Sequence, residues 1–361
     1  MSQLKGLILS GGAGTRLRPI THTSAKQLVP VANKPVLFYG IEALVAAGVT
    51  EIAIVIAPET GEEIQRAVGD GSSFGAAVTW IVQDAPRGLA HAVLCAEEFA
   101  GSDPFCMYLG DNLLRNGITE LADSFRASEP DASILLTRVP DPQHYGVAEL
   151  DATGERVVRL VEKPVEPPSD MALVGVYLFS PAIFAAAKAI EPSARGELEI
   201  TDAIQRLIDS GARVESHTVS GWWKDTGQLG DMLEANRLVL SDIEREIDSA
   251  ATLIDSKLEG PVRIAAGAKV ERSLIRGPAV IDANAVIRDA YVGPYTSIAA
   301  GCVVSEAEVE HSILLAGSRI ENVATRVEAS LLGRDAKLTQ TERRPRTIRT
   351  ILGDRSEVEV S

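Results

Sequence analysis

Over the first two-thirds of the chain, short apolar runs alternate with segments in which apolar residues recur every three to four positions. The apolar runs are rich in Val, Ile and Leu and predict strands. They are Lys5–Ser10, Glu51–Pro58, Val78–Asp84, Phe105–Gly110 and Ser133–Val139. The helical period covers Pro35–Gly48, Gly61–Val68, Leu89–Phe99 and Ile118–Ser128. This alternation predicts an α/β domain with a doubly wound, Rossmann-like sheet, whose binding site lies at the carboxyl ends of the strands.

Residues 141–225 change character and contain further strand-like segments around the Pro-rich turn Pro164–Pro168. The predicted strands are Val147–Leu150, Val157–Val161, Leu173–Phe179 and Arg213–Val219. We interpret this region as the substrate side of the same domain, which makes the sheet mixed. The first domain is expected to span residues 1–245.

Beyond residue 250 the pattern becomes a repeat with a period of 17. The heptapeptide that begins at Ile264 returns at Ile281 and again at Ile298. A second series keeps the same step: Leu258, Ile275, Val292 and Val309. One inward branched side chain per face of about six residues is typical of a left-handed parallel β-helix. Val/Ile-rich strands of a sandwich are the alternative, which the constant register disfavours. The second domain is expected to cover residues 250–361, with a capping segment at its end.

Composition narrows the class of protein. The chain has 361 residues with 50 acidic and 35 basic side chains, a net charge of −15, which argues against a nucleic-acid binder or a protein of anionic membranes. No apolar run reaches about 18 residues, so we expect no membrane-spanning helix. The first residues do not resemble a signal peptide, and three scattered cysteines suit neither a disulfide framework nor a zinc site. A cytoplasmic location is the expectation.

The charge is unevenly distributed. Residues 251–361 carry 15 groups of each sign, so the whole net charge lies in residues 1–250. Nevertheless, the first 41 residues contain no acid, and Glu42 is the first. This segment is basic and glycine-rich, which is unusual in an acidic domain.

The first predicted strand runs into a glycine-rich turn, Gly11-Gly12-Ala13-Gly14-Thr15-Arg16-Leu17. Successive backbone N–H groups in such a turn can bind an anion. The turn matches neither a phosphate loop of the NTPase kind nor a dinucleotide fingerprint. A plain glycine turn with solvated arginines is the alternative. The nearby cations Arg16, Arg18 and Lys26 favour a site for a triphosphate.

Gly11–Pro19, followed by Lys26-Gln27-Leu28, resembles the opening signature of sugar-1-phosphate nucleotidylyltransferases, and of their glucose-1-phosphate thymidylyltransferase branch in particular. Further matches run in order to about residue 240: Gln83 with Gly88-Leu89-Ala90, Leu109-Gly110-Asp111-Asn112, Tyr145-Gly146-Val147, Glu162-Lys163-Pro164, Ser193–Asp202 and Trp223–Gly227. The appended β-helix resembles the long form of this family, which is found in pathways to deoxysugars and antibiotics.

The resemblance implies attack by the phosphate of glucose 1-phosphate on the α-phosphorus of dTTP, with release of pyrophosphate and formation of dTDP-glucose. Because that phosphate is already a nucleophile, positioning and electrostatics are the main catalytic contributions. Asp111 and Asp225 are then expected to hold Mg²⁺, the implied cofactor. Each of the two aspartates also suits a plain turn.

The resemblance also implies roles for other side chains. Catalytic charges are expected from Arg16, Lys26, Asp111, Lys163 and Asp225. Nucleotide contacts are expected from Gly11, Gly12, Gly14, Thr15, Gln27, Gln83, Gly88 and Asp111. Contacts with the sugar and its phosphate are expected from Gly146, Glu162, Lys163, Val174, Gly175, Tyr177 and Arg195. Solvated surface cations, and a Glu162–Lys163 surface ion pair, are the alternatives. His91 is expected to pack or to cap its helix.

Rival functions stay open at this stage. One is an enzyme of the same chemistry that prefers UTP or another sugar 1-phosphate, and another is a non-catalytic sugar-nucleotide-binding scaffold. A bifunctional enzyme with an acetyltransferase β-helix using His311 is a weaker variant. We expect a homo-oligomer, either a tetramer or a trimer. Leu113–Gly117 replaces the aromatic-Gly-His segment that short forms of the family carry at an effector site, which argues against feedback by dTDP-rhamnose there.

Overall fold

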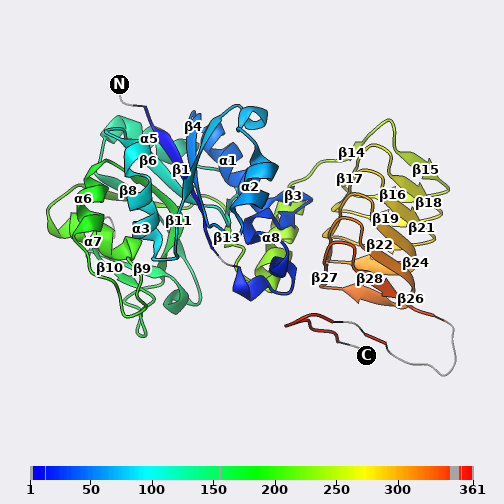
Figure 1. Ribbon diagram of the computed structural model, residues 1–361. Coiled ribbons are helices and arrows are strands. Elements are labelled where there is room, and N and C mark those ends of the chain that lie inside the picture. Colours follow the sequence, from blue (N-terminus) through cyan, green and yellow to red (C-terminus); the bar gives the residue numbers. More distant parts are fainter. Residues whose placement is uncertain (1–2, 13, 154–155, 342–348, 351, 360–361) are drawn as a thin grey trace. The chain divides into compact units, whose positions relative to one another are not determined.

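The computed structural model describes residues 3–12, 14–153, 156–341, 349–350 and 352–359 (Figure 1). Its contacts form two compact units that do not follow the chain linearly. The first unit contains the described residues up to Gly12, together with Ala25–Leu28 and Val36–Asp225. The second contains Gly14–Ser24, Val29–Pro35 and the described residues from Thr226 onward. Two segments near the N-terminus are thus grouped with the C-terminal part of the chain.

The first unit is built on a mixed sheet of nine strands, as the sequence predicts. Its parallel core consists of β1 (Lys5–Ser10), β4 (Glu51–Ile56), β5 (Ala77–Val82) and β6 (Phe105–Leu109). The remaining strands are β8 (Ala132–Arg138), β9 (Gly146–Leu150), β10 (Val157–Glu162), β11 (Met171–Phe179) and β12 (Val214–Thr218). Strand β11 runs antiparallel to β6, β8 and β9. A small separate ladder joins β7 (Asn112–Leu114) to β13 (Trp223–Asp225).

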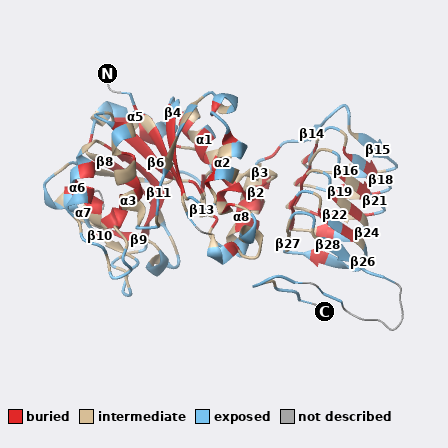
Figure 2. Ribbon diagram, viewed as in Figure 1, coloured by how far each residue is buried: buried red, intermediate tan, exposed pale blue. Residues whose placement is uncertain are grey.

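Helices cover both faces of this sheet (Figure 1). One face packs against α1 (Val36–Ala46), α2 (Gly61–Val68) and α5 (Thr119–Ser128). The other packs against α3 (Leu89–Cys95), α4 (Glu97–Ala100), α6 (Ala182–Lys188) and α7 (Ile200–Asp209). Alternate side chains of a strand supply the two cores: Leu7 and Leu9 face the second set of helices, whereas Ile8 faces the first. Figure 2 shows the buried residues concentrated along these central strands.

One predicted helix is divided. The sequence predicts a single helix over Leu89–Phe99, but the backbone leaves helical geometry at Ala96 (φ −94°, ψ 3°), where α3 ends and α4 follows. Ala96 is buried at this bend. The apolar pattern continues through the bend because both short helices bury the same face, so periodicity alone does not reveal it.

The second unit contains the parallel β-helix that the 17-residue repeat predicts, left-handed in its winding. One sheet consists of β14 (Glu246–Ile247), β17 (Val262–Ile264), β20 (Ala279–Ile281), β23 (Thr296–Ile298), β25 (Ile313–Leu314) and β27 (Leu331–Leu332). The other begins with β15 (Thr252–Ile254), β16 (Lys257–Glu259), β18 (Lys269–Glu271), β19 (Leu274–Arg276), β21 (Val286–Arg288) and β22 (Tyr291–Val292). It continues with β24 (Val303–Glu310), β26 (Arg319–Glu328) and β28 (Lys337–Thr339).

The register of the coils follows the repeat. Ile264, Ile281 and Ile298 are paired in adjacent strands, as are Leu258, Ile275, Val292 and Val309. Later coils change length, since Ile298 pairs with Leu314 and Leu314 with Leu332. One coil is therefore a residue shorter than 17 and the next a residue longer, which explains why the sequence pattern weakens after Leu315 although the coils continue.

Helix α8 (Leu229–Leu240) joins the β-helix to the antiparallel pair β2 (Pro30–Val31) and β3 (Lys34–Pro35). Asn236 on α8 is fully buried. Its Oδ1 accepts from Ala32 N at 2.9 Å and from Ser297 Oγ at 2.6 Å, and its Nδ2 donates to the Tyr295 carbonyl at 3.0 Å. A single satisfied amide thus links three segments that are far apart in the sequence. No helix in the described residues is both long and apolar enough to cross a membrane.

Candidate functional site

A cavity of about 260 Å³ opens in the first unit at the carboxyl ends of β1, β5 and β6. This is the edge at which doubly wound sheets bind ligands. Seven of the predicted nucleotide-binding and catalytic residues line the cavity: Gly11, Gly12, Lys26, Gln27, Gln83, Gly88 and Asp111. The structure therefore brings into one cavity residues that come from four separate segments of the chain.

The charged end of this cavity contains Lys26 and Asp111. The Lys26 Nζ forms an ion pair with Asp111 Oδ2, and each side chain is 17% exposed. Asn112 Nδ2 donates to the other oxygen of the carboxylate, Asp111 Oδ1, at 3.0 Å. The carboxylate is thus held from two sides, with a cation beside it.

The second predicted metal ligand, Asp225, reaches the same region through the small β7–β13 ladder. In that ladder Asp225 is the cross-strand partner of Asn112, the residue that follows Asp111. Residues directly opposite each other in an antiparallel pair lie about 4.5–5.5 Å apart at Cα. The backbone at Asp225 therefore lies beside the residue that follows Asp111, although more than a hundred residues of sequence separate them.

Asn112 is one residue of the site that sequence reasoning missed. It is buried, and its Oδ1 accepts from Trp223 Nε1 at 2.6 Å and from Gly175 N at 3.3 Å. A Cβ on Gly175 would lie only 2.8 Å from that oxygen, so the close approach requires glycine. The one available signal was the position of Asn112 directly after Asp111 in the matched motif, which does not reveal its partners.

A second group of predicted residues assembles around Glu162. Gly146 is its cross-strand partner, Lys163 Nζ lies 3.3 Å from Glu162 Oε1, and Arg195 Nη2 lies 3.4 Å from the same oxygen. Arg195 Nη2 also donates to both carboxylate oxygens of Glu199, at 2.8 and 2.9 Å. Glu199 is 3% exposed and was not predicted as a site residue. The cations predicted for the sugar phosphate are thus held in place by carboxylates.

Two residues predicted for the sugar site are part of the core. Val174 is fully buried among the side chains of one face of the sheet, and Tyr177 is buried in the core of the opposite face, where it stacks on Phe179. Burial raises the pKa of the Tyr177 phenol. Contact between either side chain and a sugar stays a prediction.

Three further predicted residues, Gly14, Thr15 and Arg16, belong to the second unit. Gly14 adopts a left-handed backbone (φ 61°), and its carbonyl accepts from Thr21 Oγ1 at 2.6 Å. Thr15–Leu17 forms a 3₁₀ turn on which Arg16 is exposed. Arg355 Nη1 donates to the Thr15 carbonyl at 3.1 Å.

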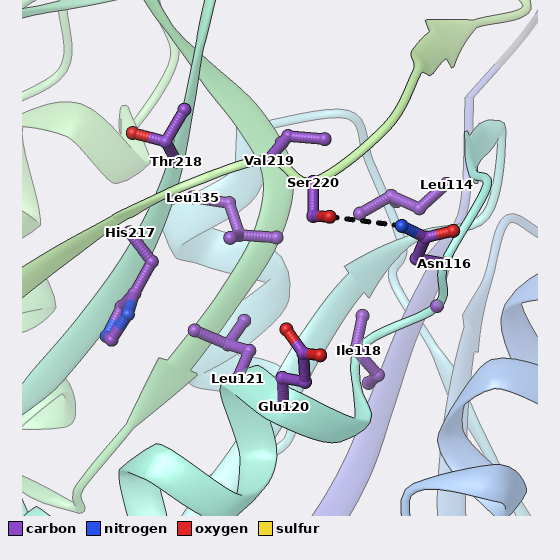
Figure 3. Close-up of a pocket in the computed structure, with 11 residues that line it drawn as sticks. Leu114, Asn116, Ile118, Glu120, Leu121, Leu135, His217, Thr218, Val219 and Ser220 are labelled. Carbon is purple, nitrogen blue, oxygen red and sulfur yellow. Dashed lines mark hydrogen bonds between the residues drawn. The ribbon is translucent and has the colours of Figure 1, made fainter.

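A smaller cavity of about 130 Å³ lies elsewhere in the first unit (Figure 3). It is lined by Leu114, Asn116–Ile118, Glu120 and Leu121, together with Leu135 and His217–Ser220. Asn116 Nδ2 donates to Ser220 Oγ at 3.1 Å across it. None of the predicted catalytic residues lines this cavity, so it is separate from the Lys26–Asp111 site.

Comparison with known proteins agrees with this geometry. A family model described as nucleotidyl transferase matches residues 5–242. A glucose-1-phosphate thymidylyltransferase of Streptomyces griseus is 54% identical over 360 residues, which cover 99% of this chain and 100% of that protein. A low-salt glycan biosynthesis nucleotidyltransferase of Haloferax volcanii is 47% identical over 361 residues, 99% of this chain and 100% of that one.

A solved structure points the same way. The crystal structure of a glucose-1-phosphate thymidylyltransferase from Bacillus anthracis in complex with a sucrose has a TM-score of 0.63 and 36% identity, and covers 67% of this chain and 97% of that one. Almost the whole of that structure matches, but it covers only about two-thirds of the present chain. The chain is a nucleotidyltransferase enzyme that belongs to the nucleotidyl transferase family, in the group of the glucose-1-phosphate thymidylyltransferases.

Proposed function

We propose that the enzyme transfers a thymidylyl group from dTTP to glucose 1-phosphate and releases pyrophosphate, for deoxysugar biosynthesis. The observation that carries this proposal is the cavity in which the amides Gln27 and Gln83 lie with the Lys26–Asp111 ion pair. Amides suit the edge of a nucleobase and charged groups suit its phosphates. The names of full-length relatives support the same substrates.

The cations of the site have distinct proposed tasks. Lys26 binds phosphate oxygens of dTTP, and Arg16 stabilises the negative charge that builds up at the α-phosphate. Lys163 and Arg195 hold the phosphate of the sugar in line with that phosphorus. Since the attacking oxygen is already ionised, no side chain needs to remove a proton, and rate enhancement comes from alignment and charge neutralisation.

Asp111 and Asp225 are the residues we propose to hold Mg²⁺. The donor set fits this ion, because Mg²⁺ is usually bound by one or two carboxylates together with substrate phosphates and water. No cluster of three His, Cys, Asp or Glu side chains suited to a metal occurs among the described residues. When bound, Mg²⁺ supplies positive charge to the phosphates.

The base and the sugar are proposed to occupy the two ends of this region. Gln27 is 2% exposed, and its Oε1 makes no hydrogen bond to any described residue, which leaves a buried acceptor for a ligand. Glu162, with Gly146 opposite, is proposed to accept hydrogen bonds from sugar hydroxyls. Since dTTP and glucose 1-phosphate are metabolites of the cytoplasm, the enzyme is proposed to act there. It is also proposed to be a homo-oligomer.

The test is a matrix of nucleoside triphosphates against sugar 1-phosphates, with pyrophosphate release as the readout. We expect the highest kcat/KM for dTTP with glucose 1-phosphate, and loss of turnover when EDTA removes Mg²⁺. A UDP-glucose pyrophosphorylase of similar fold (TM-score 0.59, 25% identity) makes UTP the important competitor. Higher kcat/KM with UTP would replace the proposed nucleotide, and no release with either would overturn the proposal.

A further inference from the structure

Gln83 lies at the carboxyl end of β5, on the floor of the nucleotide cavity. Its backbone N–H continues the ladder by donating to the Ile56 carbonyl at 2.9 Å, and the side chain is 8% exposed. A Cβ built on Gly11 would lie 3.3 Å from Gln83 Oε1, so the carboxamide oxygen sits over the glycine-rich turn. The orientation of this amide decides whether the cavity offers a ligand a donor or an acceptor.

The amide nitrogen of Gln83 meets two acceptors of the protein. Gln83 Nε2 donates to the Gly88 carbonyl oxygen at 3.3 Å and to His91 Nδ1 at 3.0 Å. A carbonyl oxygen can only accept, so the group beside Gly88 must be the NH₂ of the amide. His91 Nδ1 must then be unprotonated, with the ring hydrogen on Nε2. Both hydrogens of the amide are therefore used within the protein.

The backbone around Gly88 is built to hold this arrangement. Gly88 adopts φ 102° and ψ 170° at the start of α3, and a Cβ there would lie 2.3 Å from the Leu198 carbonyl oxygen. Only glycine fits such a position. Ala90 N donates to that same carbonyl at 3.0 Å, which anchors the first turn of α3 and with it His91, one residue further on.

We propose that His91 is a positioning residue for selection of the nucleobase, because with Gly88 it fixes the Gln83 amide so that only Oε1 faces the ligand. This inference rests on the proposed function, in which Gln83 meets the base. Thymine and uracil present a ring N3–H that such an acceptor can bind. Cytosine presents an unprotonated N3 in that position and would place two acceptors face to face. The cavity therefore selects bases with a ring N–H donor.

The activity test compares dTTP, dUTP and dCTP, which share the deoxyribose. His91→Leu removes the acceptor at Nδ1, so the Gln83 amide becomes free to rotate and exchange the positions of Oε1 and Nε2. We expect the ratio of kcat/KM for dTTP over dCTP to fall by about tenfold, the worth of one well-placed hydrogen bond, while the dTTP over dUTP ratio stays within about twofold. His91→Asn can place an amide oxygen near the Nδ1 position and should restore most of the dTTP over dCTP ratio.

Cys95→Ala is the matched control. Cys95 Sγ is the other neighbour of His91 Nδ1, at 3.9 Å, and its loss leaves the bond to Gln83 intact, so both ratios should stay at the wild-type values. An unchanged dTTP over dCTP ratio in His91→Leu, or equal losses with both nucleotides, would overturn the role of His91.

A second measurement does not depend on turnover, and its main readout uses the wild-type protein. The chain has only five histidines, so ¹⁵N spectra of the imidazoles of the wild-type protein are simple to assign. His91 is expected to show an unprotonated Nδ1 that shifts in Gln83→Leu, whereas a protonated Nδ1 would overturn the inference. If the wild-type enzyme releases no pyrophosphate from dTTP, the proposed function fails, and this spectrum still decides whether His91 holds the amide.

Discussion

The indole nitrogen of Trp223 donates to Asn112 Oδ1 at 2.6 Å, across the two-stranded ladder that also brings Asp225 opposite Asn112. Through the other end of its amide, Asn112 donates to Asp111. One buried amide thus couples Asp111, in the turn before β7, to the strand β13 that carries Asp225. The geometry of the Asp111 carboxylate therefore depends on a side chain that has no assigned contact with either substrate.

Trp223→Phe should therefore lower kcat more than it lowers stability. The substitution keeps an aromatic ring, smaller than the indole, but removes the N–H, which leaves Asn112 with fewer donors and a less fixed orientation. We expect kcat to fall about tenfold and the free energy of unfolding to fall by about 1 kcal/mol. Trp222→Phe, the neighbouring indole, is the control and should change kcat by less than about twofold. Equal kcat in both variants would show that the bond does not position the site.

Asp111→Ala and Asp225→Ala should each abolish turnover while the protein stays folded, because each removes a carboxylate proposed for Mg²⁺. The measurement is pyrophosphate release over a titration of Mg²⁺, together with circular dichroism. Asp123→Ala serves as the control, since Asp123 is an exposed partner of Arg126 on α5. Near-normal rates at saturating Mg²⁺ in either site variant would remove that residue from the metal site.

Arg16→Ala should reduce kcat by about 10²–10³, the usual effect of deleting one preorganised donor to a charged transition state. Arg16 is exposed, so the free energy of unfolding should change little. Steady-state kinetics separates the alternatives: a change confined to KM would mean that Arg16 binds the ground state and the transition state equally.

The β-helix gives a stability prediction. Ile287 is fully buried between Val270 and Val304 of the adjacent coils, and Ile287→Ala should lower the free energy of unfolding of this unit by about 2–5 kcal/mol. The adjacent Arg288 points outward and pairs with Glu271 at 2.9 Å, so Arg288→Ala should cost about 1 kcal/mol or less. Denaturant unfolding of both variants measures the difference, and similar losses would contradict the assignment of inward and outward positions.

Thiol chemistry tests the burial of the cysteines. Burial raises the pKa of Cys106 to about 12 and also raises the pKa of Cys302. Raised pKa values favour the unreactive thiol, so at pH 8 both groups should resist alkylation until the protein unfolds. Cys95 is only half-buried and should be the first of the three to react, slowly because burial raises its pKa as well. Mass spectrometry after brief labelling identifies the modified residue, and early labelling of Cys106 would contradict its placement.

The fold could be predicted largely because its signals are local. Hydrophobic period distinguishes strand from helix within a few residues, and β1 and α2 match the predicted bounds. The bend at Ala96 was missed because it leaves the apolar pattern intact. The sequence repeat is difficult to follow beyond Leu315 because one coil there is a residue shorter than 17 and the next is a residue longer.

By itself, the sequence determined the α/β domain, the 17-residue coils, and a set of glycines, cations and carboxylates suited to a nucleotide. Only the tertiary structure decided which of these groups meet: Lys26 with Asp111, Asp225 with Asn112, and His91 with Gln83. It also placed Asn33 of the N-terminal hairpin against the β-helix, where its Nδ2 donates to the Ile298 carbonyl at 2.8 Å. The physical reason is that periodicity records the local geometry of the backbone, whereas contacts between distant side chains depend on how the whole chain closes.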